Sequence, residues 1–172
     1  MKFSYDDALK YIAMPKKILS KDQTRLDIFS YTGNSQDKRL SLVSDSDVVF
    51  LLVFNRSLKN RLKLTLHLQD EDSSLGLLRV DFNGRHKNPS ELNRHVPNFF
   101  HPYRDAFIEE SHIHYHVDGY PMLAWAVPLM VDASFSQKKF EIESDFEGVC
   151  RSFFQKITLE TKVNFLIQEA FA

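Results

Sequence analysis

The stretches "RLKLTLHLQ" (residues 61–69) and "LGLLRVDFNG" (residues 75–84) alternate apolar and polar side chains, with a polar turn, "DEDSS", between them. Successive side chains of a β-strand point to opposite faces of a sheet, so this alternation predicts two strands that each have one apolar and one polar face. The short turn favours antiparallel pairing. The apolar face would carry Leu62, Leu64, Leu66, Leu68, Leu78, Val80 and Phe82, and the polar face Arg61, Lys63, Thr65, His67, Gln69, Arg79, Asp81 and Asn83.

Other segments also have the composition of strands. They are "RLDIFSYT" (25–32), "RLSLV" (39–43), the apolar run "DVVFLLVF" (47–54), "MLAWAVPL" (122–129) and "KKFEIE" (138–143). Short polar turns separate most of them, so we expect an antiparallel meander of about six to seven strands.

Helices are predicted at both ends of the chain. Ser4 and Asp7 have the spacing of an N-terminal cap for a short helix that ends before Pro15. Ser144 and Glu147 form an S-x-x-E capping box before an amphipathic helix. A second helix would begin at Thr158 with Leu159, Val163, Leu166, Ala170 and Phe171 inward. Together these elements predict one α+β domain over residues 1–172, with the two C-terminal helices on one face of the sheet.

The composition limits the classes of function. The 172 residues carry a net charge of −1, so no global basic field indicates nucleic-acid binding, and an anion-binding surface must be local. Cys150 is the single cysteine, which excludes an internal disulfide and a cysteine-based zinc cluster; it lies on an apolar helix stripe and is expected to be a buried small hydrophobe. The N-terminal residues lack the apolar core of a signal peptide, and no apolar run is long enough to span a membrane. We therefore expect a soluble cytoplasmic protein.

Histidines concentrate in two neighbouring segments. Residues 84–110 contain three prolines and three histidines, His86, His95 and His101, and loops of this length in a compact domain are often functional. The following stretch, "SHIHYHVDGY" (111–120), places histidines at every second position. Consecutive strands are adjacent about two-thirds of the time, so His112 and His114 are expected to share the polar face with the strand at 75–83.

Three uses of this surface are open. In the first, His112 or His114 is a general acid/base oriented by Asp81, while Arg79 holds an anionic substrate such as a phosphodiester. In the second, His112 and His114 bind a divalent metal together with Asp81 or His86. In the third, the surface recognises a partner and performs no chemistry. A histidine strand of this kind can also be a solvated sheet face, and His116 is a weaker candidate because it approaches a turn.

The segment "HIHYHVD" (112–118) resembles the H-φ-H-φ-H-φ-φ signature of the histidine-triad nucleotide hydrolases, in which the middle histidine, here His114, attacks a nucleotide α-phosphate. The chain departs from that signature at Asp118, and "PYRDAFIEES" (102–111) replaces the family's Asn and Gly-rich approach. The match covers seven residues, and these departures argue against membership.

A longer resemblance is to an uncharacterised group of small bacterial and phage-borne proteins, itself distantly similar to toxins of toxin–antitoxin pairs. Its blocks occur here in order as "LLRVDFNG" (77–84), "HKNP" (86–89), "HIHYHVDGY" (112–120) and "WAVPL" (125–129). The resemblance implies a site and no settled activity. The implied site comprises His112, His114 and Asp81 as catalytic residues or metal ligands, and Arg79, Asn83, His86 and Asn88 as ligand-binding residues. Asn83-Gly84 and Asn88-Pro89 are also common turn sequences.

Two functions therefore remain open. The first is a small bacterial or phage accessory protein whose exposed sheet face binds, or hydrolyses, a phosphate-bearing ligand or nucleic acid, with a divalent metal as the candidate cofactor. The second is a non-catalytic inhibitor or antitoxin-like partner in a phage-defence or toxin–antitoxin system, docking through residues 84–110. Its interface anchors would be Arg94, Phe99, Phe100, Tyr103 and Arg104.

Overall fold

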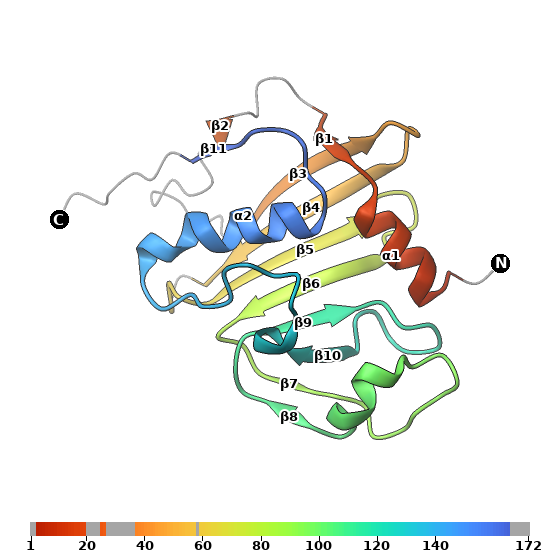
Figure 1. The fold of residues 1–172 in the computed structure, drawn as a ribbon. Helices are drawn as coiled ribbons and strands as arrows, with labels where there is room; N and C mark the ends of the chain where they lie inside the picture. The colour runs from red at the N-terminus through yellow and green to blue at the C-terminus, as the bar shows by residue number, and fades with distance from the viewer. Residues whose placement is uncertain (1–2, 20–24, 27–36, 58, 166–172) are drawn as a thin grey trace.

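The centre of the fold is a seven-stranded antiparallel sheet (Figure 1). The computed structural model describes residues 3–19, 25–26, 37–57 and 59–165. The strand order is β1-β3-β4-β5-β6-β9-β10, so the strands of this sheet lie side by side in the order in which they follow one another along the chain. The strands are β1 (Lys16–Ile18), β3 (Asp37–Ser44), β4 (Val49–Arg56), β5 (Leu64–Asp70), β6 (Gly76–Phe82), β9 (His112–Tyr115) and β10 (Trp125–Pro128).

Two helices, α1 (Tyr5–Ala13) and α2 (Phe146–Lys156), lie on the same face of this sheet (Figure 1). The core between helices and sheet contains the predicted apolar face of β5 and β6, and only Leu62 is partly exposed. Each large apolar side chain buried in this way contributes about 1.5–3 kcal/mol. The α+β class is confirmed, Cys150 is buried as expected, and Trp125 is also buried. The buried side chains of β5 and β6 are Leu64, Leu66, Leu68, Leu78, Val80 and Phe82.

Smaller elements surround the sheet. A two-stranded antiparallel pair joins β7 (His86–Lys87) to β8 (Phe107–Ile108), and 3₁₀ turns cover Asn98–Tyr103, Leu129–Val131 and Glu143–Asp145. β2 (Arg25–Leu26) pairs in parallel with β11 (Asn164–Phe165) and does not join the main sheet. The rest of the predicted strand at 25–32 lies outside the described residues.

The first helix ends against a buried lysine. Ser4 and Asp7 form the predicted capping box at its N-terminus. At its other end the Lys16 ammonium, which is fully buried, donates hydrogen bonds to the carbonyl oxygens of Tyr11, Ile12 and Met14 at 2.6–3.0 Å, and to that of Ile157 at 3.0 Å. Lys16 thus joins the C-terminal ends of α1 and α2. Burial lowers the pKa of Lys16 to about 7.

The C-terminal region differs from the prediction in three respects. The Ser144/Glu147 capping box does not form, because Asp145 occupies the N-cap position and its carboxylate accepts from the backbone of Glu141 and Ile142. No strand forms at residues 138–143. The prediction of a second helix is wrong over residues 158–165, because Thr158 has a left-handed backbone (φ 57°) and the chain then pairs with Lys16. Leu166, Ala170 and Phe171 lie outside the described residues.

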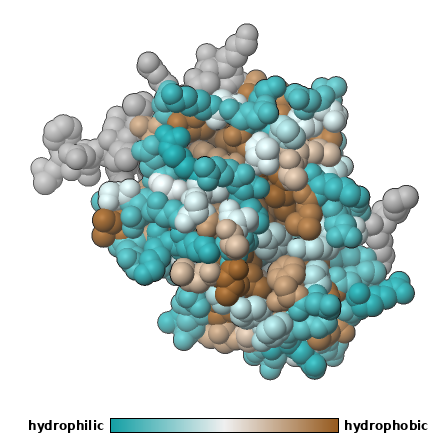
Figure 2. All heavy atoms as spheres, in the orientation of Figure 1, coloured by the Kyte–Doolittle hydropathy of each residue, from teal (hydrophilic) through white to brown (hydrophobic). Residues whose placement is uncertain are grey.

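The side of the molecule that carries the helices is mainly hydrophilic. Figure 2 shows separate apolar patches on this side, with hydrophilic side chains around them. The exposed large apolar residues of the described chain include Phe99, Phe107, Met122, Met130 and Ile142. Within the described part of the chain, no helix has the length and apolar character needed to cross a membrane.

Candidate functional site

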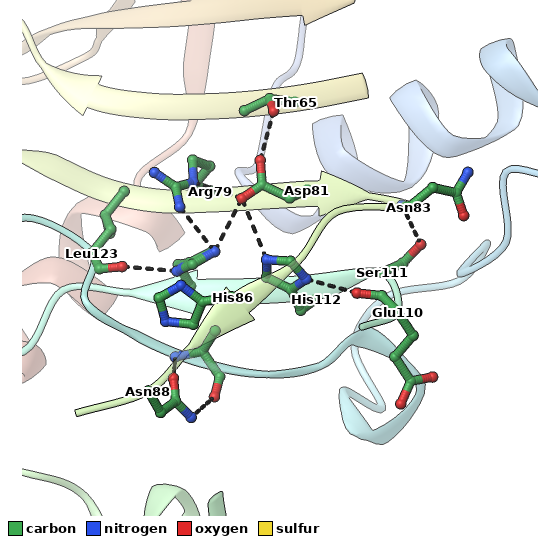
Figure 3. Close-up of polar contacts among 12 residues, drawn as sticks. Thr65, Arg79, Asp81, Asn83, His86, Asn88, Glu110, Ser111, His112 and Leu123 are labelled. Atoms are coloured by element: carbon green, nitrogen blue, oxygen red, sulfur yellow. Dashed lines mark hydrogen bonds and ion pairs between the residues drawn. The ribbon is translucent and has the colours of Figure 1, made fainter. Parts of the chain in front are cut away.

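The candidate site lies on the face of the sheet that is turned away from α1 and α2 (Figure 3). β6 and β9 are neighbours, as predicted, and their register places Arg79 opposite His114 and Asp81 opposite His112. Alternation along both strands turns these four side chains away from the core, in which Val80 and Ile113 are buried. The pleat of two paired strands therefore collects the four residues into one cluster.

Three potential metal-ligand atoms converge in this cluster. Asp81 Oδ2 lies 3.0 Å from Nε2 of His114 and 3.5 Å from Nε2 of His112, and the three atoms lie within 4.8 Å of one another. Both imidazoles are buried, with 1% and 0% of their surface exposed, whereas the Asp81 side chain is 18% exposed. Solvent therefore reaches the cluster from the side of the carboxylate.

The remaining polar atoms of these residues are held by the surrounding chain (Figure 3). Nδ1 of His112 donates to the carbonyl oxygen of Glu110 at 2.7 Å, and Nδ1 of His114 donates to that of Leu123 at 2.8 Å. Thr65 on β5 donates to the other carboxylate oxygen of Asp81 at 2.6 Å. These contacts fix both rings and the carboxylate in the orientation that points Nε2 and Oδ2 into the cluster.

The neutral tautomer of His114 directs the lone pair of its Nε2 toward the Asp81 carboxylate. A neutral imidazole that donates from Nδ1 carries its lone pair on Nε2. Burial lowers the pKa of His114 to about 4, despite the opposing effect of Asp81, so this ring is neutral at pH 7. Burial alone would raise the pKa of Asp81, but the hydrogen bonds that its carboxylate accepts, among them those from Arg79 and Thr65, outweigh this effect and hold the pKa well below its ordinary value. A carboxylate and at least one imidazole lone pair therefore share a space that attracts a cation.

The guanidinium of Arg79 already places one positive charge beside this space. Its Nε donates to Asp81 Oδ2 at 2.9 Å, and its terminal nitrogen lies 3.0 Å from Nε2 of His114. With 31% of its surface exposed, the Arg79 side chain is the most accessible of the cluster. His112 differs, because its buried Nε2 has no hydrogen-bond partner. One buried nitrogen that points at Asp81 is thus left without a hydrogen-bond partner.

His86 covers the two histidines. Its ring centroid lies 4.5 Å from that of His114 and 5.7 Å from that of His112, and its Nε2 donates to the Ala124 carbonyl at 2.8 Å. Burial lowers the pKa of His86. With Nε2 bound in this way, His86 packs over the cluster and is not one of the converging ligand atoms.

The two asparagines that were predicted to bind a ligand form hydrogen bonds to backbone groups instead. Asn88 is buried, and its amide bonds both backbone groups of Ala126 and the carbonyl of Tyr103, which attaches the 84–110 segment to the edge of β10. Asn83, at φ 54°, donates to the carbonyls of Leu62 and Phe140. The structure thus uses both amides for turns and connections, and gathers Arg79 and His86 around the catalytic candidates.

Gly84 allows the connection to pass close to the cluster. A Cβ atom at this position would lie 3.1 Å from the Cβ of Asp81 and 3.1 Å from Cε1 of His112. Such contacts are tighter than ordinary van der Waals packing, so a larger residue would displace one of the two side chains. The absence of a side chain at Gly84 therefore preserves the position of the proposed ligands.

The expectation of an exposed histidine face is wrong. His112, His114 and His116 are all buried, because the 84–110 segment and the loop before β10 cover β9. His116 lies outside the cluster and bonds the carbonyl of Phe3. Thr65 was not singled out by sequence, although the β5–β6 register that places it opposite Asp81 follows from the alternation of both strands.

The protein is thus of the α+β class, and its neighbouring strands β6 and β9 hold two histidines and an aspartate beside an arginine. Residues 3–159 match the sequence model described as "Family of unknown function (DUF6978)", and the chain belongs to this family. This agrees with the predicted membership of an uncharacterised group; the bacterial or phage origin and the likeness to toxins stay predictions. No curated protein matched the sequence, and no solved structure matched it.

Proposed function

We propose that Asp81, His112 and His114 form a divalent-metal centre at which the protein binds, and hydrolyses, a phosphate-bearing ligand. The observation that carries this proposal is the convergence of Asp81 Oδ2 with the two Nε2 atoms within 4.8 Å. The buried, unpartnered Nε2 of His112 supports it independently, because a buried polar atom without a hydrogen-bond partner is costly.

The two separations between Asp81 and the histidines suit a metal ion. Ligand bonds of about 2.0–2.2 Å in tetrahedral geometry separate two ligand atoms by about 3.3 Å. The distances from Asp81 Oδ2 to the two Nε2 atoms, 3.0 and 3.5 Å, lie within a few tenths of this value. The backbone carbonyls that accept from both Nδ1 atoms are the usual outer contacts of metal-binding histidines. Two imidazoles and one carboxylate suit Zn²⁺, Mn²⁺, Fe²⁺ or Co²⁺.

A metal centre explains the properties of the cluster better than general acid/base catalysis does. A general base that works near neutrality needs a pKa close to 7, but burial lowers the pKa of His114 to about 4. A divalent ion would act as a Lewis acid toward a phosphoryl oxygen, and the guanidinium of the partly exposed Arg79 side chain would lie beside it to bind a second oxygen. In hydrolysis, a water oxygen bonds to phosphorus, the bond to the leaving oxygen breaks, and that oxygen takes up a proton from the water.

Metal analysis and a hydrolysis assay test the proposal. The purified protein should bind about one equivalent of Zn²⁺, Mn²⁺ or Co²⁺ and then hydrolyse p-nitrophenyl phosphate or bis-p-nitrophenyl phosphate. His114→Gln and Asp81→Asn should each lose at least about tenfold in metal affinity while keeping the far-UV circular dichroism of the native protein. His95→Ala, at an exposed histidine of the 84–110 segment, should bind the metal ion with the affinity of the native protein. Absence of metal binding by a folded native protein would refute the metal centre.

The second candidate function is docking of another protein through the 84–110 segment. Of the predicted anchors, Phe99 is 43% exposed, and the neighbouring Phe107 is 57% exposed, which favours a contact surface. Phe100 is fully buried and cannot serve as an anchor. A non-catalytic protein of this kind would lose its cellular effect in Phe99→Ala or Phe107→Ala and keep it in His114→Gln, whereas a metal enzyme would give the opposite pattern.

A further inference from the structure

The contacts of Arg79 conflict with the binding of a metal ion at the same atoms. Its Nε donates to Asp81 Oδ2 and its terminal nitrogen approaches Nε2 of His114, and both acceptors are proposed metal ligands. A guanidinium that bridges a carboxylate and an imidazole neutralises the cluster in the way that a bound cation would. The positive charge of Arg79 therefore compensates part of the negative charge that a bound ion would compensate in its place.

The two acceptors differ in what they can share. A carboxylate oxygen has two lone pairs, so Asp81 Oδ2 can keep the Arg79 contact and bind a metal. An imidazole nitrogen has one lone pair, and Nδ1 of His114 is already the donor to Leu123. Nε2 of His114 can therefore accept from Arg79 or ligate a metal, but it cannot do both.

We propose that Arg79 and the divalent ion exclude each other at Nε2 of His114, and that metal binding releases the guanidinium to bind the ligand's phosphate group. This inference rests on the proposed metal centre. The released group needs little rearrangement, since Arg79 is already the most exposed side chain of the cluster and its Nε contact with Asp81 can persist. The guanidinium is thus an internal competitor of the metal and a binding group for the anion.

Coupling between the two ligands follows from this competition. An anion that binds Arg79 holds the guanidinium away from His114 and should tighten metal binding, and the metal should tighten anion binding by the same factor. Removal of the guanidinium should have a double effect. The metal site gains affinity, because the competitor and its like charge are gone, and the anion loses its binding group.

Binding of Co²⁺ to the full-length protein tests the inference, measured by visible absorption and by competition with a chelator. The anion probe is phenylphosphonate, which carries a phosphate-like group that cannot be hydrolysed. In the native protein, phenylphosphonate should tighten Co²⁺ binding by about tenfold, a typical coupling. Arg79→Met should bind Co²⁺ alone about tenfold more tightly than the native protein and show no effect of phenylphosphonate. Arg85→Met removes an exposed arginine and should behave as the native protein does.

The outcomes separate this inference from the proposed function. Equal or weaker Co²⁺ binding by Arg79→Met, with binding by the native protein, overturns the competition and leaves the metal centre intact. No Co²⁺ binding by either protein overturns both. Binding that is detectable only in Arg79→Met supports the competition in its strongest form. Thermal unfolding of each variant, with and without Co²⁺, shows that the comparison is made between folded proteins, since a bound ion raises the unfolding temperature.

Discussion

Substitution of Asn88 by alanine should destabilise the fold rather than remove a ligand contact. The buried amide donates to the carbonyls of Tyr103 and Ala126 at 3.0 and 2.8 Å and accepts from the Ala126 N–H at 2.9 Å. Three hydrogen bonds at about 1 kcal/mol each give a loss of about 3 kcal/mol, before the cost of the unpaired backbone groups is added. For a chain of this length, that loss lowers the Tm by roughly 6–12 °C.

Urea unfolding followed by circular dichroism measures this loss of stability. Asn98→Ala, at an exposed asparagine in a 3₁₀ turn, is the matched control and should stay within about 0.5 kcal/mol of the native protein. The reasoning is refuted if Asn88→Ala unfolds as the native protein does. A variant of native stability that had lost ligand binding would instead restore the sequence-based assignment of Asn88 to the ligand.

Three further predictions concern pH, the close approach at Gly84 and the buried lysine. Acidification from pH 7 to pH 5 should lower the free energy of unfolding of the metal-free protein by about 2–4 kcal/mol. The reason is that burial lowers the pKa values of His67 and His114 to about 4, so both side chains take up protons on unfolding. Urea titrations at the two pH values check this, and His67→Gln should remove part of the difference. Gly84→Ala should weaken Co²⁺ binding by about tenfold with an unchanged circular dichroism spectrum, because the new methyl group meets Asp81; unchanged affinity would contradict the packing argument. Lys16→Met should lower the free energy of unfolding by about 3 kcal/mol or more, since four carbonyl groups lose their donor; a loss below 1 kcal/mol in the same titration would argue against their role.

The sequence was sufficient to predict strands β5 and β6 and the pairing with β9 that builds the cluster. Strict alternation in β5 and β6 assigns Leu66 and Val80 to the core and Asp81 to the opposite face, and a short connection makes antiparallel neighbours. The histidine period of two then places His112 beside Asp81 once β9 pairs with β6. The faces of the strands follow from local alternation of side chains, and the neighbours of each strand follow from the order of the strands along the chain.

The burial of the site could not be predicted in the same way. It depends on where a connection without periodicity folds, and that path is set by single side-chain contacts such as those of His86 and Asn88 with β10. The predicted helix after Thr158 failed for a related reason. Apolar spacing suits a helix there, but backbone pairing with Lys16, distant in sequence, competes successfully for the same residues. Long-range backbone contacts leave no periodic signal in one sequence.

The four carbonyl acceptors of Lys16 also bear on the order in which the chain can fold. Three of them belong to the end of the first helix, but the fourth, on Ile157, is synthesised 141 residues later. Until that residue leaves the ribosome, the lysine cannot complete its set of acceptors, and its charge favours remaining in water. We therefore expect α1 to dock late, after the strands of the central sheet have paired, even though it precedes these strands in the chain.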